Sequence, residues 1–167
     1  KDREKILQYV EQLQKQNDFV IVSIHWGPNL KEFPAKRFIG FAHEMIDHGA
    51  SVIHGHSAHN FQGIELYKQK LIFYDTGDFV DDYIVHADLK NDHSFFFMVE
   101  FSKQEMIRTK LVPVLISNYQ VNLAPDENKN WSIERIRQLS AKFGTTITGQ
   151  GEVFIVKQKE AIKYNNP

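Results

Sequence analysis

FVIVSIH at residues 19–25 and SVIHGHSAH at residues 51–59 are the two stretches of this 167-residue chain that decide its fold. Each begins as a short apolar run rich in β-branched residues, the pattern of a buried strand, and each reaches histidine. Between them, residues 34–48 carry apolar side chains at helical spacing and stop before Gly49, which predicts a helix. The order strand, helix, strand predicts a right-handed βαβ unit with parallel strands.

The histidines of these stretches follow or end the two predicted strands. Parallel strands bring their carboxyl ends to one edge of a sheet, where open α/β sheets place their ligands. We therefore expect His25 to lie beside His54, His56 and His59. Converging neutral imidazoles are a usual way to hold zinc or another transition metal. His25, His56 and His59 are interpreted as metal ligands; a histidine bonded to a carbonyl, or a polar surface turn, is the alternative.

Composition narrows the class of protein. A length of 167 residues suffices for one well-cored domain. With 20 Lys and Arg against 21 Asp and Glu, the formal net charge is -1, which gives no reason to expect a nucleic acid or an anionic membrane as partner. No apolar run is long enough to form a membrane-spanning segment. Cysteine is absent, so a metal would be bound by His, Asp, Glu or Asn.

The rest of the chain predicts antiparallel strands and a further helix. The expected elements are strands at 63–67 and 70–74 forming a hairpin, strands at 94–101 and 106–116 joined by a tight turn at 102–105, a loop at 118–129, a helix at 131–143 and a strand at 152–157. The polar composition of 118–129 and its Pro125 favour the loop. The fold class is therefore α/β with a mixed sheet.

Three motifs in order resemble the capsule-synthesis CapA (PGA_cap) family, from about Asp18 to Asp82. They are His25-Trp26-Gly27, Gly55-His56-x-x-His59-x-x-Gln62-Gly63-Ile64-Glu65 and Phe73-Tyr74-x-x-Gly77-x-Phe79. This family is a branch of the calcineurin-like metallophosphoesterase superfamily. The resemblance thus implies an αββα fold, a sandwich of two mixed sheets flanked by helices with a two-metal site at the strand ends.

The resemblance also implies roles for individual residues. His25 matches a histidine that follows a strand, and His56 and His59 match the motif histidines, which implies that all three are catalytic residues and ligands. The implied cofactors are divalent transition metal ions (Mn, Fe or Zn), two in the complete protein. The superfamily's earlier half supplies further ligands, and none of its motifs precedes His25 here. Residues 1–167 are therefore expected to be a single domain or the C-terminal part of one larger CapA-like domain, whose missing N-terminal half is a partner. The isolated chain is expected to be inactive.

Residues around the three histidines depart from the family pattern. Asp78 stands where the family usually has Asn, and His54 where an aliphatic residue is common. His54, Gln62 and Asp78 are candidates for orienting the ligands or contacting substrate. The alternative role of His54 is core packing, that of Gln62 is a hydrogen bond to the loop backbone, and that of Asp78 is a turn carboxylate. The other carboxylates of the loop are interpreted as turn formers with solvated charges: Asp75, Asp81 and Asp82.

The resemblance implies a metal-dependent phosphoesterase-type hydrolase linked to capsule or poly-γ-glutamate synthesis or processing, with a phosphorylated or polymer substrate. Amide chemistry is an alternative for the same family. A catalytically silent module that binds a polymer or partner through the histidine rim is a second hypothesis, and an α/β domain with structural histidines is a third. Capsule-related members often act at the cell envelope; the cytoplasm is the alternative location.

Overall fold

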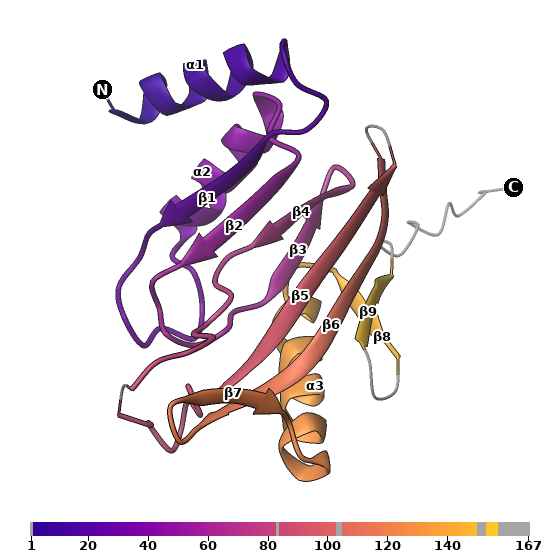
Figure 1. The fold of residues 1–167 in the computed structure, drawn as a ribbon. Coiled ribbons are helices and arrows are strands. Elements are labelled where there is room, and N and C mark those ends of the chain that lie inside the picture. Colours follow the sequence, from indigo (N-terminus) through magenta and orange to yellow (C-terminus); the bar gives the residue numbers. More distant parts are fainter. Residues whose placement is uncertain (1, 83, 103–104, 150–152, 157–167) are drawn as a thin grey trace, which may run out of the picture.

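The computed structural model describes residues 2–82, 84–102, 105–149 and 153–156 (Figure 1). In chain order the elements are α1 (Asp2–Gln14), β1 (Ile21–His25), α2 (Lys36–Asp47), β2 (Val52–His56), β3 (Ile64–Tyr67), β4 (Lys70–Phe73), β5 (His93–Ser102), β6 (Glu105–Ser117), β7 (Gln120–Leu123), α3 (Asp126–Ala141), β8 (Thr146–Thr148) and β9 (Val153–Val156). Among the described residues, no helix combines the length and the apolarity needed to cross a bilayer.

The first sheet is mixed and contains the predicted βαβ unit. Its strand order is β1-β2-β4-β3, with β1, β2 and β4 parallel and β3 antiparallel to β4. The helix α2 connects β1 to β2, and its buried side chains pack against Ile53 and Ile72 of the sheet. These side chains are Ala42, Met45 and Ile46. The strand–helix–strand prediction and the hairpin predicted at 63–74 are therefore confirmed, with β3 beginning at Ile64 and β4 ending at Phe73.

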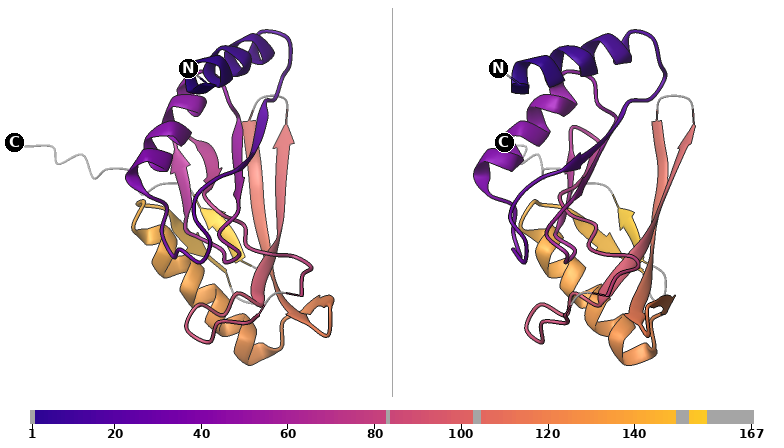
Figure 2. Two further views of the ribbon diagram at one scale, coloured as in Figure 1. Left: turned by 90° about the vertical axis from the view of Figure 1, so that its left-hand side faces the viewer. Right: turned by 60° about the vertical axis from the view of Figure 1, so that its left-hand side comes forward.

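The second sheet is antiparallel, with the order β5-β6-β9-β8 and with β7 paired to β6. Figure 2 shows α1 and α2 on one side of the first sheet and the long strands β5 and β6 on its other side. The largest buried cluster joins the two sheets with α3 and includes Phe61, Leu66, Phe95, Leu111 and Ile136. The α/β class is confirmed, with one mixed and one antiparallel sheet.

The loop predicted at 118–129 is wrong, because this segment forms β7 and the first turn of α3. Asn118 and Tyr119 adopt positive φ angles of 52° and 60°, so the chain turns back at once and pairs with β6. Pro125 stands immediately before α3, where its fixed φ is compatible with helix entry. The carboxylates Asp126 and Glu127 then stabilise the helix amino terminus.

Other predicted elements also differ from the structure in their boundaries. The helix predicted at 131–143 begins at Asp126 and ends at Ala141. The strand β8 was not predicted, because three residues carry too little pattern to mark a strand. The strand expected at 152–157 is present as β9, while its two outermost residues lie outside the described residues, as does the middle of the turn expected at 102–105.

Candidate metal site

The carboxyl ends of β1 and β2 bring His25 and His56 together. The parallel register places these two residues opposite each other, and their Nδ1 atoms lie 3.3 Å apart. Burial, and then the nearby His25, lower the pKa of His56 below its usual range. His56 is therefore neutral at neutral pH, with a nitrogen lone pair that can bind a metal. The expectation that parallel strands would bring these histidines together agrees with this geometry.

Gly55, between the histidines of β2, lets the neighbouring backbone come close. A Cβ atom at this position would lie 2.2 Å from the carbonyl oxygen of Tyr74 and 2.6 Å from Nε1 of Trp26. The Trp26 indole donates a hydrogen bond to that same carbonyl, at 2.8 Å. The Thr76 N–H donates to the carbonyl of Gly55. These contacts hold the loops that follow β1, β2 and β4 against one another.

His59 lies in the loop after β2 and contacts carboxylates from the loop after β4. Its Nδ1 is 3.0 Å and 3.2 Å from the two carboxylate oxygens of Asp78. Ligand atoms of His59, Asp78 and Asp81 all lie within 4.8 Å of one another, and all three residues are half-buried. One imidazole nitrogen and two carboxylates form a donor set that suits a divalent transition metal. We call His59, Asp78 and Asp81 the His–Asp–Asp triad.

The pKa of Asp78 reflects the close packing of the triad. Burial, followed by the hydrogen bond with Asp81, raises the pKa of Asp78 to about 7, while His59 opposes the shift. Two carboxylates brought together away from water repel each other when both are ionised. A bound cation would relieve that repulsion, so the local chemistry fits a metal.

Asp75 corrects one expectation, because it is buried and does not carry a solvated charge. Its side chain accepts hydrogen bonds from the N–H groups of Ala58, at 2.7 Å, and Gly77, at 2.9 Å. Only 2% of the residue is exposed, and burial raises the pKa of Asp75 to about 6 against the effect of these two N–H groups. Asp75 therefore joins the loop that carries His59 to the loop that carries Asp78.

The side chains of His54 and Gln62 both contact polar groups within the protein. The ring nitrogens of His54 lie 2.9 Å from Ser23 Oγ and 3.2 Å from Thr76 Oγ1, so this residue links β1 to the loop after β4. Burial, and then His56, lower the pKa of His54. Gln62 is buried and donates to the carbonyl of Lys31, which matches the backbone contact weighed as its alternative role.

The structure thus divides the three predicted histidines between two groups. His25 and His56 form a pair, whereas His59 belongs to the His–Asp–Asp triad. Sequence reasoning missed Asp81 as a potential ligand. The spacing Asp78-x-x-Asp81, in the loop that follows β4, was the signal that could have identified it.

Comparisons with known proteins agree with the histidine motifs. The family model described as "Bacterial capsule synthesis protein PGA_cap" matches residues 1–83. A probable polyglutamine synthesis accessory protein of Mycobacterium tuberculosis is 31% identical over 135 residues, which are 78% of this chain and 36% of that relative.

Two capsule proteins match shorter stretches. The capsule biosynthesis protein CapA of Bacillus anthracis is 43% identical over 65 residues, 39% of this chain and 16% of that relative. The PGA biosynthesis protein CapA of Bacillus subtilis is 37% identical over 81 residues, 48% of this chain and 21% of that relative. The chain therefore spans about a third, or less, of the length of these curated relatives.

Proposed function

This chain belongs to the PGA_cap family of bacterial capsule synthesis proteins, and on that premise we propose that it carries part of the metal site of a hydrolase that acts in capsule or poly-γ-glutamate synthesis or processing. The observation that carries the proposal is the His–Asp–Asp triad, whose ligand atoms lie within 4.8 Å of one another beside the motif histidines. Two stacked sheets with this group at the strand ends support a calcineurin-like metallophosphoesterase arrangement.

In this proposal the triad would hold one divalent transition metal ion, Mn, Fe or Zn, and the pair His25 and His56 would contribute to a second. Metal bound there would polarise a phosphoryl or carbonyl oxygen of the substrate. If His56 alone binds that second ion, His25, which is exposed at the rim, would be free to hand a proton to a leaving group. His54, whose two ring nitrogens contact Ser23 and Thr76, orients the strand end that carries His56.

The substrate is proposed from the relatives' names and from the site chemistry together. Those names refer to polyglutamine, capsule and PGA synthesis. A phosphorylated intermediate and a glutamate polymer both present oxygens that a divalent metal can polarise, so phosphoester and amide hydrolysis are the two reactions to test. The cell envelope is the proposed place of action.

Metal content tests the site first. Elemental analysis of the longest polypeptide that carries this chain should find near-stoichiometric transition metal in the wild type. His59→Ala and Asp78→Ala should each lose most of it, because each removes one donor of the triad. His86→Ala is the matched control, since His86 is exposed and belongs to no motif. Negligible metal in wild type and variants alike would contradict the proposal.

Turnover separates the hydrolase from a second candidate, a polymer- or partner-binding module. The observation that favours the module is that the described residues supply one group of three ligands and one histidine pair. Metal-dependent cleavage of p-nitrophenyl phosphate esters or of poly-γ-glutamate, lost in His56→Ala, supports the hydrolase. Metal binding and polymer binding without turnover would support the module.

A further inference from the structure

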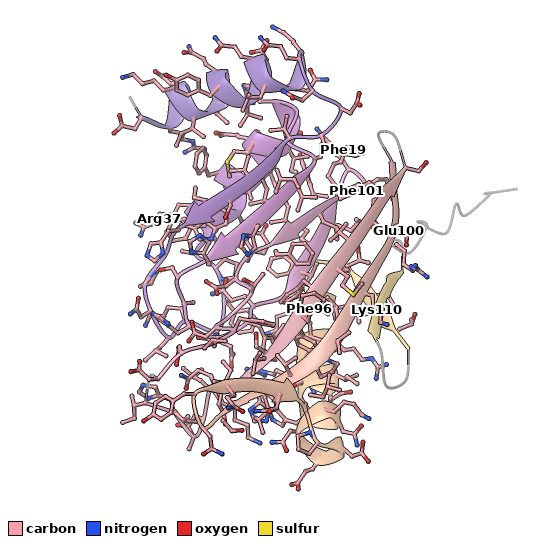
Figure 3. All side chains as sticks on the ribbon, viewed as in Figure 1. Phe19, Arg37, Phe96, Glu100, Phe101 and Lys110 are labelled. Atoms are coloured by element: carbon pink, nitrogen blue, oxygen red, sulfur yellow. The ribbon has the colours of Figure 1, made fainter. Side chains whose placement is uncertain are left out.

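Three motif residues that the proposed metal site does not use lie buried on the α2 side of the first sheet. They are Trp26, Glu65 and Tyr74, and each comes from a different one of the three motifs. Glu65 stands opposite Ile72 in the β3–β4 pairing, so their side chains share a face, and Ile72 packs in the cluster that contains α2. Side chains fill the space between this face and α2 (Figure 3). The three motif residues therefore lie in the core behind the strand ends.

Glu65 places a carboxyl group in this core, although only 8% of the residue is exposed. Its Oε2 accepts a hydrogen bond from the Tyr74 hydroxyl at 2.5 Å and lies 3.0 Å from Nε2 of His43 in α2. Burying a carboxyl group costs free energy that an apolar side chain would not, so such a group is weak evidence of a stabilising role. A carboxyl group at this position indicates instead that it holds a neighbour in place.

Tyr74 carries this constraint from Glu65 toward the end of β1. Burial, and then the hydrogen bond with Glu65, raise the pKa of the Tyr74 hydroxyl above its usual range, so the hydroxyl keeps its proton and remains a donor. The Tyr74 ring stacks with Trp26, with ring centroids 6.3 Å apart and planes 18° apart. The Tyr74 carbonyl accepts the indole N–H of Trp26 at 2.8 Å. Tyr74 is therefore held by Glu65 at its hydroxyl and holds Trp26 with its ring and its backbone.

Trp26 connects Tyr74 to both members of the histidine pair. It directly follows His25 in the chain, and its backbone N–H donates to the carbonyl of His56 at 3.0 Å. Because Trp26 is held by Tyr74 on one side and by His56 on the other, a displacement of Tyr74 would move the two imidazoles relative to each other.

We propose that Glu65 and Tyr74 are positioning residues of the metal site, because the hydrogen bond between them fixes Trp26 and thereby the geometry of the His25–His56 pair. Neither residue is itself a ligand in this proposal. Groups that hold a ligand in its binding orientation typically change metal affinity by about 10–100-fold. The part of the inference that concerns metal affinity rests on the proposed function, whereas the effect on the two imidazoles does not.

Tyr74→Phe tests the inference, because it removes a single oxygen atom and keeps the stacked ring. The longest polypeptide that carries this chain is used throughout. In the metal-free protein, the imidazole NMR signals of His25 and His56 should shift, while those of His93, whose ring contacts Asn128 of α3, should not. In buffers of graded free Zn²⁺ concentration, the His25 and His56 signals should report an affinity about tenfold weaker than in the wild type.

Three further variants separate positioning from stability. Glu65→Gln keeps an acceptor oxygen for the Tyr74 hydroxyl, so its imidazole signals should stay in place and its Zn²⁺ affinity should stay within about threefold of the wild type. Glu65→Met/Tyr74→Phe removes donor and acceptor together and should reproduce the result of Tyr74→Phe. Ile147→Val shortens a buried side chain of β8, so it should lower the melting temperature and change neither readout.

Unchanged imidazole signals of His25 and His56 in Tyr74→Phe would overturn the inference. So would a Zn²⁺ affinity that is the same in Tyr74→Phe and Ile147→Val. If the wild type binds no metal, the proposed function fails, and the imidazole signals of the metal-free protein still decide the inference.

Discussion

Gly55 shows how one residue determines whether the histidine-bearing loops can meet. It stands between His54 and His56 in β2, where the backbone of Tyr74 and the indole of Trp26 approach closely. A methyl group in that space would force apart the loops that carry the candidate ligands. Glycine at this position therefore serves the site through packing and not through flexibility.

Gly55→Ala should lower the free energy of unfolding by about 3 kcal/mol or more, because a Cβ atom 2.2 Å from a backbone oxygen cannot be accommodated without backbone movement. Gly40→Ala in α2 is the matched control. It meets no atom within 4 Å and should raise stability by about 0.5–1 kcal/mol through helix propensity. Urea unfolding of both variants measures the difference. Equal effects in the two variants would contradict the close-packing explanation.

Asp75 should make stability depend on pH. Its pKa in the folded protein is about 6, above the usual 3.8, so the folded state binds the proton more tightly than the unfolded state. The stabilising contribution of Asp75 is thus present below about pH 4 and is lost as the pH rises through about 6. Relative to Asp75→Asn, the wild type should lose on the order of 3 kcal/mol between these limits.

Urea unfolding at about pH 4 and about pH 7, with a chelator present, measures this difference between wild type and Asp75→Asn. The chelator keeps any metal bound near His59 and Asp78 from contributing. If the two proteins differ by the same free energy at both pH values, burial does not raise the Asp75 pKa.

At the scale of elements, α3 both closes the core and protects an edge. Its Ser140 accepts a hydrogen bond from the Ile64 N–H of β3, at 2.9 Å, where a sheet edge would otherwise be unpaired. Gly63 allows this approach, because a Cβ there would lie 2.6 Å from the carbonyl of Leu139. The first sheet thus depends on a helix that begins at Asp126, although the last strand of the sheet ends at Phe73.

Ser140→Ala should destabilise the protein by about 1–3 kcal/mol, because it leaves the buried Ile64 N–H without its acceptor. Ser132→Ala is a matched control in the same helix. Both serines are fully buried, yet Ser132 Oγ has no hydrogen-bond partner among the described residues. Its removal should be neutral or slightly stabilising. Denaturant unfolding measures the stability of both variants. An equal loss of unfolding free energy in the two would mean that the hydrogen bond between β3 and α3 contributes nothing to stability.

At the scale of the whole molecule, exposed apolar side chains gather along a groove between β1 and β5. Phe79 and Phe96, whose rings lie 6.0 Å apart, belong to its lining. Phe96 is 49% and Met98 46% exposed. Within the part of the chain that the structure describes, β1 and β5 are also edge strands of their sheets, and both features favour association between molecules.

Chain 1–167 on its own should therefore associate increasingly as its concentration rises, as measured by size-exclusion chromatography with light scattering. Phe96→Ser should weaken the association, because it removes exposed apolar surface from β5. Ile84→Ser is a control outside the sheets, since Ile84 is even more exposed, at 74%. A compact monomer at every concentration would contradict this prediction.

Much of the fold, and part of the site, was predictable from local pattern. The apolar runs and the helix between them predict the βαβ unit, and parallel pairing predicts that His25 meets His56. The segment 118–129 was not predictable, because its polar composition hides a strand held by pairing with β6 and a helix entered at Pro125. Burial of Asp75 was equally hidden, because the N–H groups that satisfy it belong to a distant loop and to its own turn.

By itself, the sequence determined the strand–helix–strand order, the family and the two histidine-bearing strand ends, because hydrophobic period and motif spacing are local properties of the chain. Only the tertiary structure decided that His59 joins Asp78 and Asp81 while His25 pairs with His56. It also decided that, among the strands that the structure describes, β1 and β5 are the edges that border one groove. The physical reason is that side-chain direction, burial and edge exposure depend on how separate loops and sheets pack against each other, which no local pattern encodes.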